Sequence, residues 1–140
     1  MIYVDTNIFV YAIENHPKYG EVCKKILLDI ESEKIKASAS VLVLVELINV
    51  LTKINRMLKI KDKKPLDIKN NIDAVLSFPI TWFDLDFLII KKAAEYTYNV
   101  TGVDYIHIAT MEANSIGEII SADDELDKVK FIKRIDPKDY

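Results

Sequence analysis

The sequence is poor in the residues that break, bend or cross-link a chain. Of its 140 residues only three are glycine, four are proline and one, Cys23, is cysteine. A single cysteine cannot build a disulfide framework, and so few glycines and prolines leave little room for disordered linkers. We therefore expect a single domain over residues 1–140, with Cys23 packed in its core.

Long apolar runs and a basic amino-terminal leader are also missing. No apolar run approaches the roughly 20 residues that cross a bilayer, and Asp5 interrupts the apolar opening almost at once. These absences predict a cytoplasmic protein with no membrane segment. Histidine or cysteine pairs at the spacing of a zinc site are absent as well.

The charge is unevenly distributed along the chain. A net charge of −3 argues weakly against a nucleic-acid partner, because phosphate binding favours a basic surface. The stretch KINRMLKIKDKK, from Lys53 to Lys64, nevertheless holds six basic residues and one acid. It is either the solvated end of a helix, where lysines suit the helix dipole, or a surface that contacts phosphates.

Short apolar strands alternate with segments of helical periodicity along the whole chain. Strands are expected at residues 1–4, 35–40, 79–83, 118–121 and 130–135, with helices between them. Expected helix caps are Asn7 for a helix beginning at Ile8, Ser38 or Ser40 for the next long helix, and Asp84 or Asp86 further on. The alternation predicts a three-layer, Rossmann-like α/β fold with a central, mainly parallel sheet of four to five strands.

Four acidic residues stand where a solvated loop or helix face is not expected. Asp5 ends the first strand, Asp123 follows the strand EIIS, and Asp104 lies in the first turn of a helix. Because ligand sites form beyond the carboxyl ends of parallel strands, these three side chains can face one edge of the sheet. Glu46 interrupts the apolar run VLVLVELI, where an uncompensated buried carboxylate would cost several kcal/mol.

A divalent cation would compensate such a cluster of carboxylates. Carboxylates with open water positions suit Mg²⁺ or Mn²⁺ rather than zinc. Each acid also has a simpler explanation: Asp5 as a helix cap, Glu46 as a surface position, Asp104 as a partner of the helix dipole and Asp123 as a turn residue. The presence of all four acids in one chain favours a metal site over four separate explanations.

Four blocks of the sequence resemble a known family. They read YVDTNIFVYAI, SASVLVLVELINVL, GVDYIHIATM and IISADDELDKVKFIKRIDP, and together they cover essentially the whole chain. They are similar to the successive blocks of the PIN domain, and in particular of the VapC-type toxin ribonucleases. The resemblance implies a PIN-like fold and an acidic site at Asp5, Glu46, Asp104 and Asp123, supported by Thr6, Asn7 and Ser121.

The same resemblance implies an activity and partners. The protein would be a Mg²⁺- or Mn²⁺-dependent endoribonuclease that hydrolyses RNA phosphodiester bonds with an activated water. Asp5, Asp104 and Asp123 would hold metal and Glu46 would orient the water. Separately from the resemblance, Lys53 lies seven residues after Glu46 on nearly the same side of the helix, and Lys53 and Arg56 are candidates for RNA contacts. A toxin of this type would pair with a small antitoxin and form a homodimer.

Several alternatives remain open from the sequence. Asp124 could replace or supplement Asp123, although the strand-turn spacing favours Asp123, and His107 could touch a substrate phosphate or simply pack beside the sheet. A non-catalytic PIN-like module that binds RNA or protein is the main alternative function. Haloacid-dehalogenase-like phosphatases and response-regulator receivers are disfavoured, since Asn7 stands where the former need a second aspartate and the latter need an acidic pair.

Overall fold

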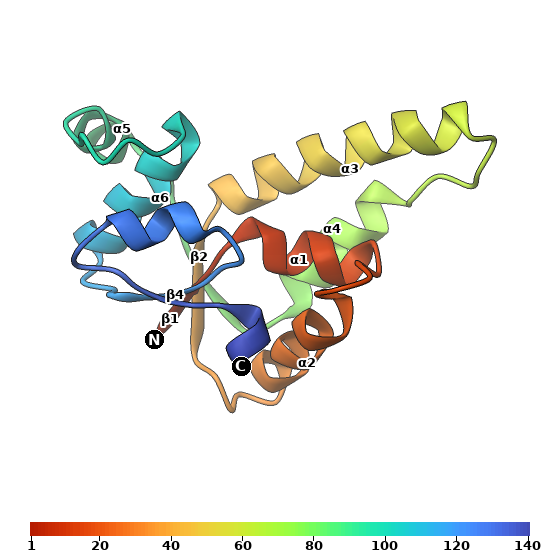
Figure 1. Ribbon diagram of the computed structural model, residues 1–140, viewed down its shortest axis with the longest axis horizontal. Coiled ribbons are helices and arrows are strands. Elements are labelled where there is room, and N and C mark those ends of the chain that lie inside the picture. The colour runs from red at the N-terminus through yellow and green to blue at the C-terminus, as the bar shows by residue number, and fades with distance from the viewer.

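The computed structural model describes residues 1–140, in which strands and helices alternate (Figure 1). The strands are β1 (Ile2–Val4), β2 (Ala37–Ser40), β3 (Ile80–Phe83), β4 (Glu118–Ile120) and β5 (Lys133–Ile135). The α-helices are α1 (Thr6–Ile13), α2 (Gly20–Glu31), α3 (Leu42–Ile60), α4 (Ile68–Ser77), α5 (Phe87–Ala93) and α6 (Gly102–Ala113). Two short 3₁₀ helices, η1 (Asp124–Lys128) and η2 (Pro137–Asp139), flank β5.

The strands form one sheet in the order β3-β2-β1-β4-β5, and every neighbouring pair is parallel. The predicted α/β fold is therefore confirmed, with five strands. The chain builds outward from β1 to β2 and β3 on one side, and then returns to place β4 and β5 on the other side of β1. The strand order thus reverses beside β1, where open α/β sheets form their ligand sites.

The alternation of side chains along β1 divides the core between the two faces of the sheet. Val4 points to one face, where it packs with Ile120 and with apolar residues of α1, α2, α3 and α4. Tyr3 points to the other face and packs with Ile119 and with Ile108 of α6. These two clusters make the helical layers on either side of the sheet.

Some helix boundaries differ from the expected ones. The prediction that Asn7 caps a helix beginning at Ile8 is wrong, because α1 begins at Thr6 and Asp5 is its cap, with its carboxylate accepting from the Thr6 N–H. Ser40 does bind the start of α3, since its hydroxyl accepts from the Leu42 N–H. Asp86 caps α5 as expected.

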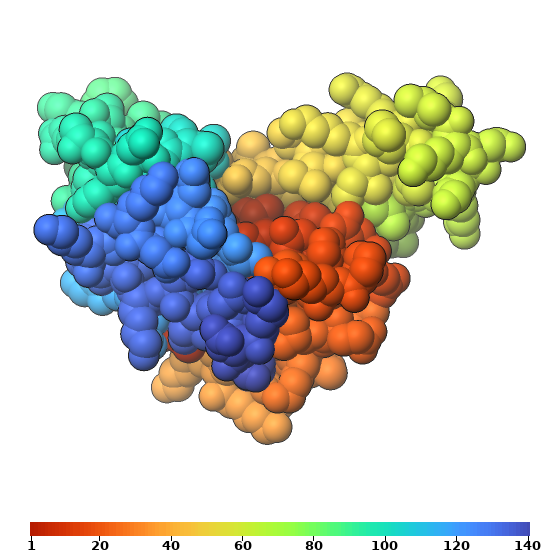
Figure 2. Space-filling view, in the orientation of Figure 1, coloured from red at the N-terminus to blue at the C-terminus, as the bar shows by residue number.

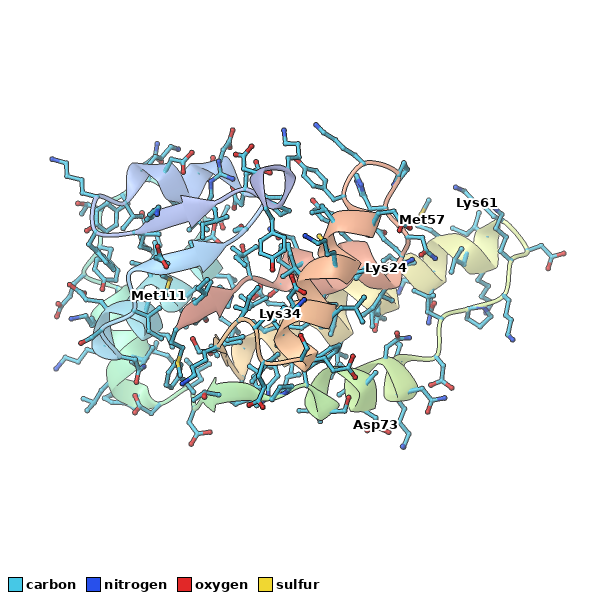
Figure 3. All side chains as sticks on the ribbon, turned by 90° about the horizontal axis from the view of Figure 1, so that it is seen from below. Lys24, Lys34, Met57, Lys61, Asp73 and Met111 are labelled. Atoms are coloured by element: carbon cyan, nitrogen blue, oxygen red, sulfur yellow. The ribbon has the colours of Figure 1, made fainter.

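The helix α3 packs over its first half and extends beyond the sheet over its second half (Figure 1). Leu47 and Leu51 are fully buried in the same core cluster as Val4. Ile48, next to Leu47 on the helix, is 47% exposed. Met57 and Lys61 lie at the outer end of the helix, far from the body that contains Met111 (Figure 3).

Cys23 is a free, buried cysteine on α2, as the sequence predicts. None of the helices combines the length and the apolar character required to cross a membrane.

The two positions on α3 provide a test of this packing. Leu51→Ala should lower the free energy of unfolding by about 2–5 kcal/mol, because it leaves a cavity in the core. The matched change Ile48→Ala, on the exposed side of the same helix, should cost less than about 0.5 kcal/mol. Urea denaturation followed by circular dichroism measures both, and equal losses would contradict the placement of α3.

Candidate active site

The acidic residues selected from the sequence meet at the carboxyl edge of the sheet. They line a cleft of about 300 Å³ together with Thr6, Asn7, Val10, Tyr11 and Val50. Figure 2 shows a hollow between the teal segment that contains α5 and the yellow outer part of α3, with red amino-terminal residues at its floor. Asp5, Glu46, Asp104 and Asp123 come from four segments spread over the chain, and all four line this cleft.

Asp5 lies at the floor of the cleft, at the end of the central strand. Its backbone N–H donates to the Ile120 carbonyl at 3.1 Å, which ties it to β4. One carboxylate oxygen accepts from the Thr6 N–H at 2.7 Å, and the other accepts from the Ser121 hydroxyl at 2.5 Å. The side chain is only 8% exposed. Asp5 therefore both caps α1 and faces the cleft, so the two explanations offered by the sequence are compatible.

Asn7 and Ser121 brace the floor of the cleft. The Asn7 amide donates to the Ser121 hydroxyl at 3.1 Å and to the Asp5 carboxylate at 3.3 Å. Its carbonyl oxygen accepts from the Ala122 N–H at 3.3 Å. These contacts join α1 to the loop after β4, so the two predicted supporting residues hold Asp5 against that loop.

Glu46 projects from α3 and is held by two donors on the same oxygen. The Thr6 hydroxyl donates to Glu46 Oε1 at 2.9 Å, and His107 Nε2 contacts that same oxygen. The other carboxylate oxygen, Oε2, has no hydrogen-bond partner and is accessible to solvent. Glu46 is half-buried, between the buried and surface positions that the sequence left open, because its side chain is 28% exposed at the wall of the cleft.

The sequence did not predict that Tyr3 and His107 would form a hydrogen-bonded chain to Glu46. His107 is 2% exposed, and its Nδ1 lies 2.6 Å from the Tyr3 hydroxyl oxygen beneath the cleft. Packing beside the sheet was one of the two expectations for His107, and the structure agrees with it. The available signals were positional: Tyr3 lies two residues before Asp5 on a strand, and His107 lies one helical turn after Asp104.

Asp104 and Asp123 lie at the starts of helices on the other side of the cleft. The Thr101 hydroxyl donates to Asp104 at 2.7 Å in the first turn of α6. Asp123 caps η1 by accepting from the Glu125 N–H at 3.0 Å. The neighbouring Asp124 is exposed and does not line the cleft, so the geometry favours Asp123.

Burial, helped by the neighbouring carboxylates, raises the pKa values of two acids in the cleft. Burial raises the pKa of Asp5, although the Ser121 hydroxyl and the nearby His107 oppose it. Burial also raises the pKa of Asp104, and the charges of Asp5 and Asp123 add to the effect. Burial acts to lower the pKa of His107, but the bond to Glu46 and the surrounding carboxylates outweigh it and raise that pKa.

The chemistry of the donors suits a hard divalent cation, since carboxylate oxygens are the ligands that Mg²⁺ and Mn²⁺ prefer. As the side chains are placed, no three acidic, histidine or cysteine groups lie close enough to enclose an ion. Hydrogen bonds to protein donors hold Asp5, Asp104 and Asp123 in these positions. The residue types therefore fit a metal, but binding one would require some of these side chains to turn toward each other.

The two candidate RNA contacts lie further along α3, outside the acidic cleft. Lys53 and Arg56 are both exposed. Arg56 borders a separate groove of about 420 Å³ at the outer end of the helix, together with Lys59 and Lys63. This groove is larger than the acidic cleft, but Asp62 is the only acid that lines it.

Comparison with known proteins identifies the family. The model of the PIN domain matches residues 2–132. The chain belongs to the PIN domain family. No curated protein matches the sequence significantly.

Solved PIN-like structures share the fold over nearly the whole chain. A toxin-antitoxin complex from Klebsiella pneumoniae is 15% identical with a TM-score of 0.66, and the match covers 98% of both chains. VapBC2 from Rickettsia felis, bound to a promoter DNA fragment, is 18% identical with a TM-score of 0.64 over 96% of this chain and 98% of that one. VapC20 from Mycobacterium tuberculosis, a toxin that cleaves the sarcin-ricin loop, is 18% identical with a TM-score of 0.64 over 85% and 87%.

The raised pKa of Asp104 in this PIN domain predicts how its stability depends on pH. The pKa of Asp104 is higher in the folded than in the unfolded chain, so stability falls as the pH rises from about 4 through that raised pKa. Asp104→Asn removes the ionised group and should raise the melting temperature by about 2–6 °C at pH 7.5 in EDTA. The gain should shrink toward pH 4.

The control for this measurement is Asp124→Asn, which neutralises an exposed aspartate outside the cleft. Differential scanning fluorimetry from pH 4 to pH 8 compares the two variants with the wild type. A gain for Asp104→Asn that does not depend on pH, or one that Asp124→Asn matches, would contradict this electrostatic explanation.

Proposed function

We propose that this PIN domain protein is a Mg²⁺- or Mn²⁺-dependent endoribonuclease, the toxin of a toxin–antitoxin pair. The observation that carries the proposal is the meeting of Asp5, Glu46, Asp104 and Asp123 in one cleft at the reversal of strand order. Structural similarity to VapC20, a toxin that cleaves the sarcin-ricin loop, supports a nuclease activity. Hydrolysis of a phosphodiester bond is the reaction that fits this acidic donor set.

Each acid has a distinct part in the proposal. Asp5, Asp104 and Asp123 would hold the cation, which when bound would lower the pKa of a water and offset phosphate charge. Glu46 would orient the attacking water and accept its proton through Oε2, which no protein donor occupies. The Ser121 and Thr6 contacts keep Asp5 at the floor of the cleft.

RNA would approach along the basic part of α3. Lys53 and Arg56 are exposed on the helix that also carries Glu46, and Lys59 and Lys63 extend the positive charge outward. A cation in the cleft would reverse the local sign of the acidic site, so the net charge of −3 is compatible with an RNA substrate.

A small antitoxin and a second copy of the chain are the proposed protein partners. The similar structures from Klebsiella pneumoniae and Rickettsia felis are toxin–antitoxin assemblies. On α5, Phe87 is 79% exposed and Leu88 is 70% exposed. Large apolar side chains in water are typical of a protein interface, which supports a homodimer.

The activity can be tested directly on structured RNA. The wild type should cleave members of a panel of structured RNAs when Mg²⁺ or Mn²⁺ is added, and EDTA should stop the cleavage. Asp5→Asn and Glu46→Gln should each lower the rate by about 10²–10⁴-fold, because each removes a group that acts on the reacting water or the cation. Gel electrophoresis of the products measures the rates.

Asp124→Asn is the matched control, since it removes a neighbouring acid that does not line the cleft. Millimolar Mn²⁺ should also raise the melting temperature of the wild type and of Asp124→Asn, and much less that of Asp5→Asn. RNA binding without cleavage in either metal would instead favour a non-catalytic PIN domain. An unchanged melting temperature would contradict the metal site.

The RNA contacts predict a specific dependence on salt. Replacing Lys53 and Arg56 with alanine should weaken RNA binding and lower the slope of log K against log salt by about 1.4, near 0.7 for each lost contact with a single strand. The control is the pair Lys36→Ala and Lys133→Ala, at the amino ends of β2 and β5. Filter binding at several salt concentrations measures both slopes, and equal slopes would contradict the assignment.

A further inference from the structure

A chain of hydrogen bonds runs beneath the cleft from the sheet to Glu46. The Ser40 N–H donates to the Tyr3 hydroxyl oxygen at 3.1 Å, and that oxygen lies 2.6 Å from His107 Nδ1. His107 Nε2 then contacts Glu46 Oε1. Tyr3 is fully buried and neither ring lines the cleft, so these groups have no direct access to a substrate.

The directions of these bonds follow from the available hydrogens. The Ser40 N–H can only donate, so Nδ1 of a neutral His107 is the acceptor available to the Tyr3 hydrogen. A neutral imidazole then carries its hydrogen on Nε2, and a protonated imidazole carries one there as well. In both states Nε2 donates to the Glu46 carboxylate.

We infer that Tyr3 and His107 are positioning residues that hold Glu46 Oε1 and keep Oε2 available to the attacking water. The inference rests on the proposed nuclease function. Thr6 donates to the same Oε1, so two donors from two different elements fix that oxygen. Oε2 has no protein partner and remains accessible at the cleft wall.

Fixing one oxygen matters because a glutamate side chain has several rotatable bonds. A carboxylate that is free to rotate would spend little time in the orientation that accepts a proton from water, and a misplacement of about 1 Å can cost 10²-fold in rate. Buried partners that orient a group at the site commonly contribute about 10–100-fold. Tyr3 acts on Glu46 through His107. By donating to Nδ1 it disfavours the tautomer with its hydrogen on Nδ1, in which the lone pair of Nε2 would face the Glu46 carboxylate.

The test uses substitutions that keep or remove the donor to Glu46. His107→Leu should lower kcat by about 10–100-fold with KM changed by less than about twofold. His107→Gln, whose amide nitrogen can replace Nε2, should restore most of that loss, and Tyr3→Phe should lower kcat by about 3–10-fold. Met111→Leu, a buried change on the same helix α6, controls for altered packing and should leave kcat unchanged.

Nitrogen NMR of the His107 ring provides a readout that does not depend on turnover. In metal-free wild type at a pH above the titration of His107, Nε2 should carry the hydrogen and Nδ1 should not. A hydrogen on Nδ1 would overturn the inference, as would a folded His107→Leu variant with wild-type kcat or a His107→Gln variant no better than His107→Leu. If the wild type cleaves no RNA in any metal, the nuclease proposal fails, and the NMR result decides the hydrogen-bond chain separately.

Discussion

The structure depends on holding one carboxylate, Asp5, at the buried end of the central strand. An isolated buried charge would be costly, so Asp5 is surrounded by donors from three places: the Thr6 backbone, the Asn7 amide and the Ser121 hydroxyl. Those donors also join α1 to the loop after β4. The buried carboxylate of Asp5 is therefore the group through which α1 is connected to the loop after β4.

The same constraint explains why the other acids lie where they do. Asp104 and Asp123 occupy the starts of helices, where backbone or hydroxyl donors satisfy part of each carboxylate. Glu46 is held by Thr6 and His107 on one oxygen. Each acid is bonded to protein donors, yet burial, with a smaller effect of the neighbouring carboxylates, still raises the pKa of Asp5 and Asp104. Folding stability is lowered at this place, as is common at functional sites.

The strand β1 contributes side chains to the cores on both faces of the sheet. Val4 belongs to the cluster under α1 and α3, whereas Tyr3 belongs to the cluster under α6. Because consecutive residues of a strand point to opposite faces, one short strand contributes to both cores and ends in the site. Tyr3 can thus reach His107 from below while Asp5 faces the cleft above.

The sequence by itself determined the alternating α/β pattern, the three aspartates at the ends of elements and Glu46 within an apolar helix, because apolar periodicity and isolated charges are local signals. Tertiary structure alone decided which oxygen of Glu46 is held and by what. The Tyr3–His107–Glu46 chain joins residues up to 104 positions apart, and no local pattern encodes such a contact. The exposure of Ile48 was likewise decided by tertiary structure, since periodicity shows which residues share a helix face but not which part of that face the neighbouring elements cover. Leu47 and Leu51, before and after Ile48 on the helix, are fully buried.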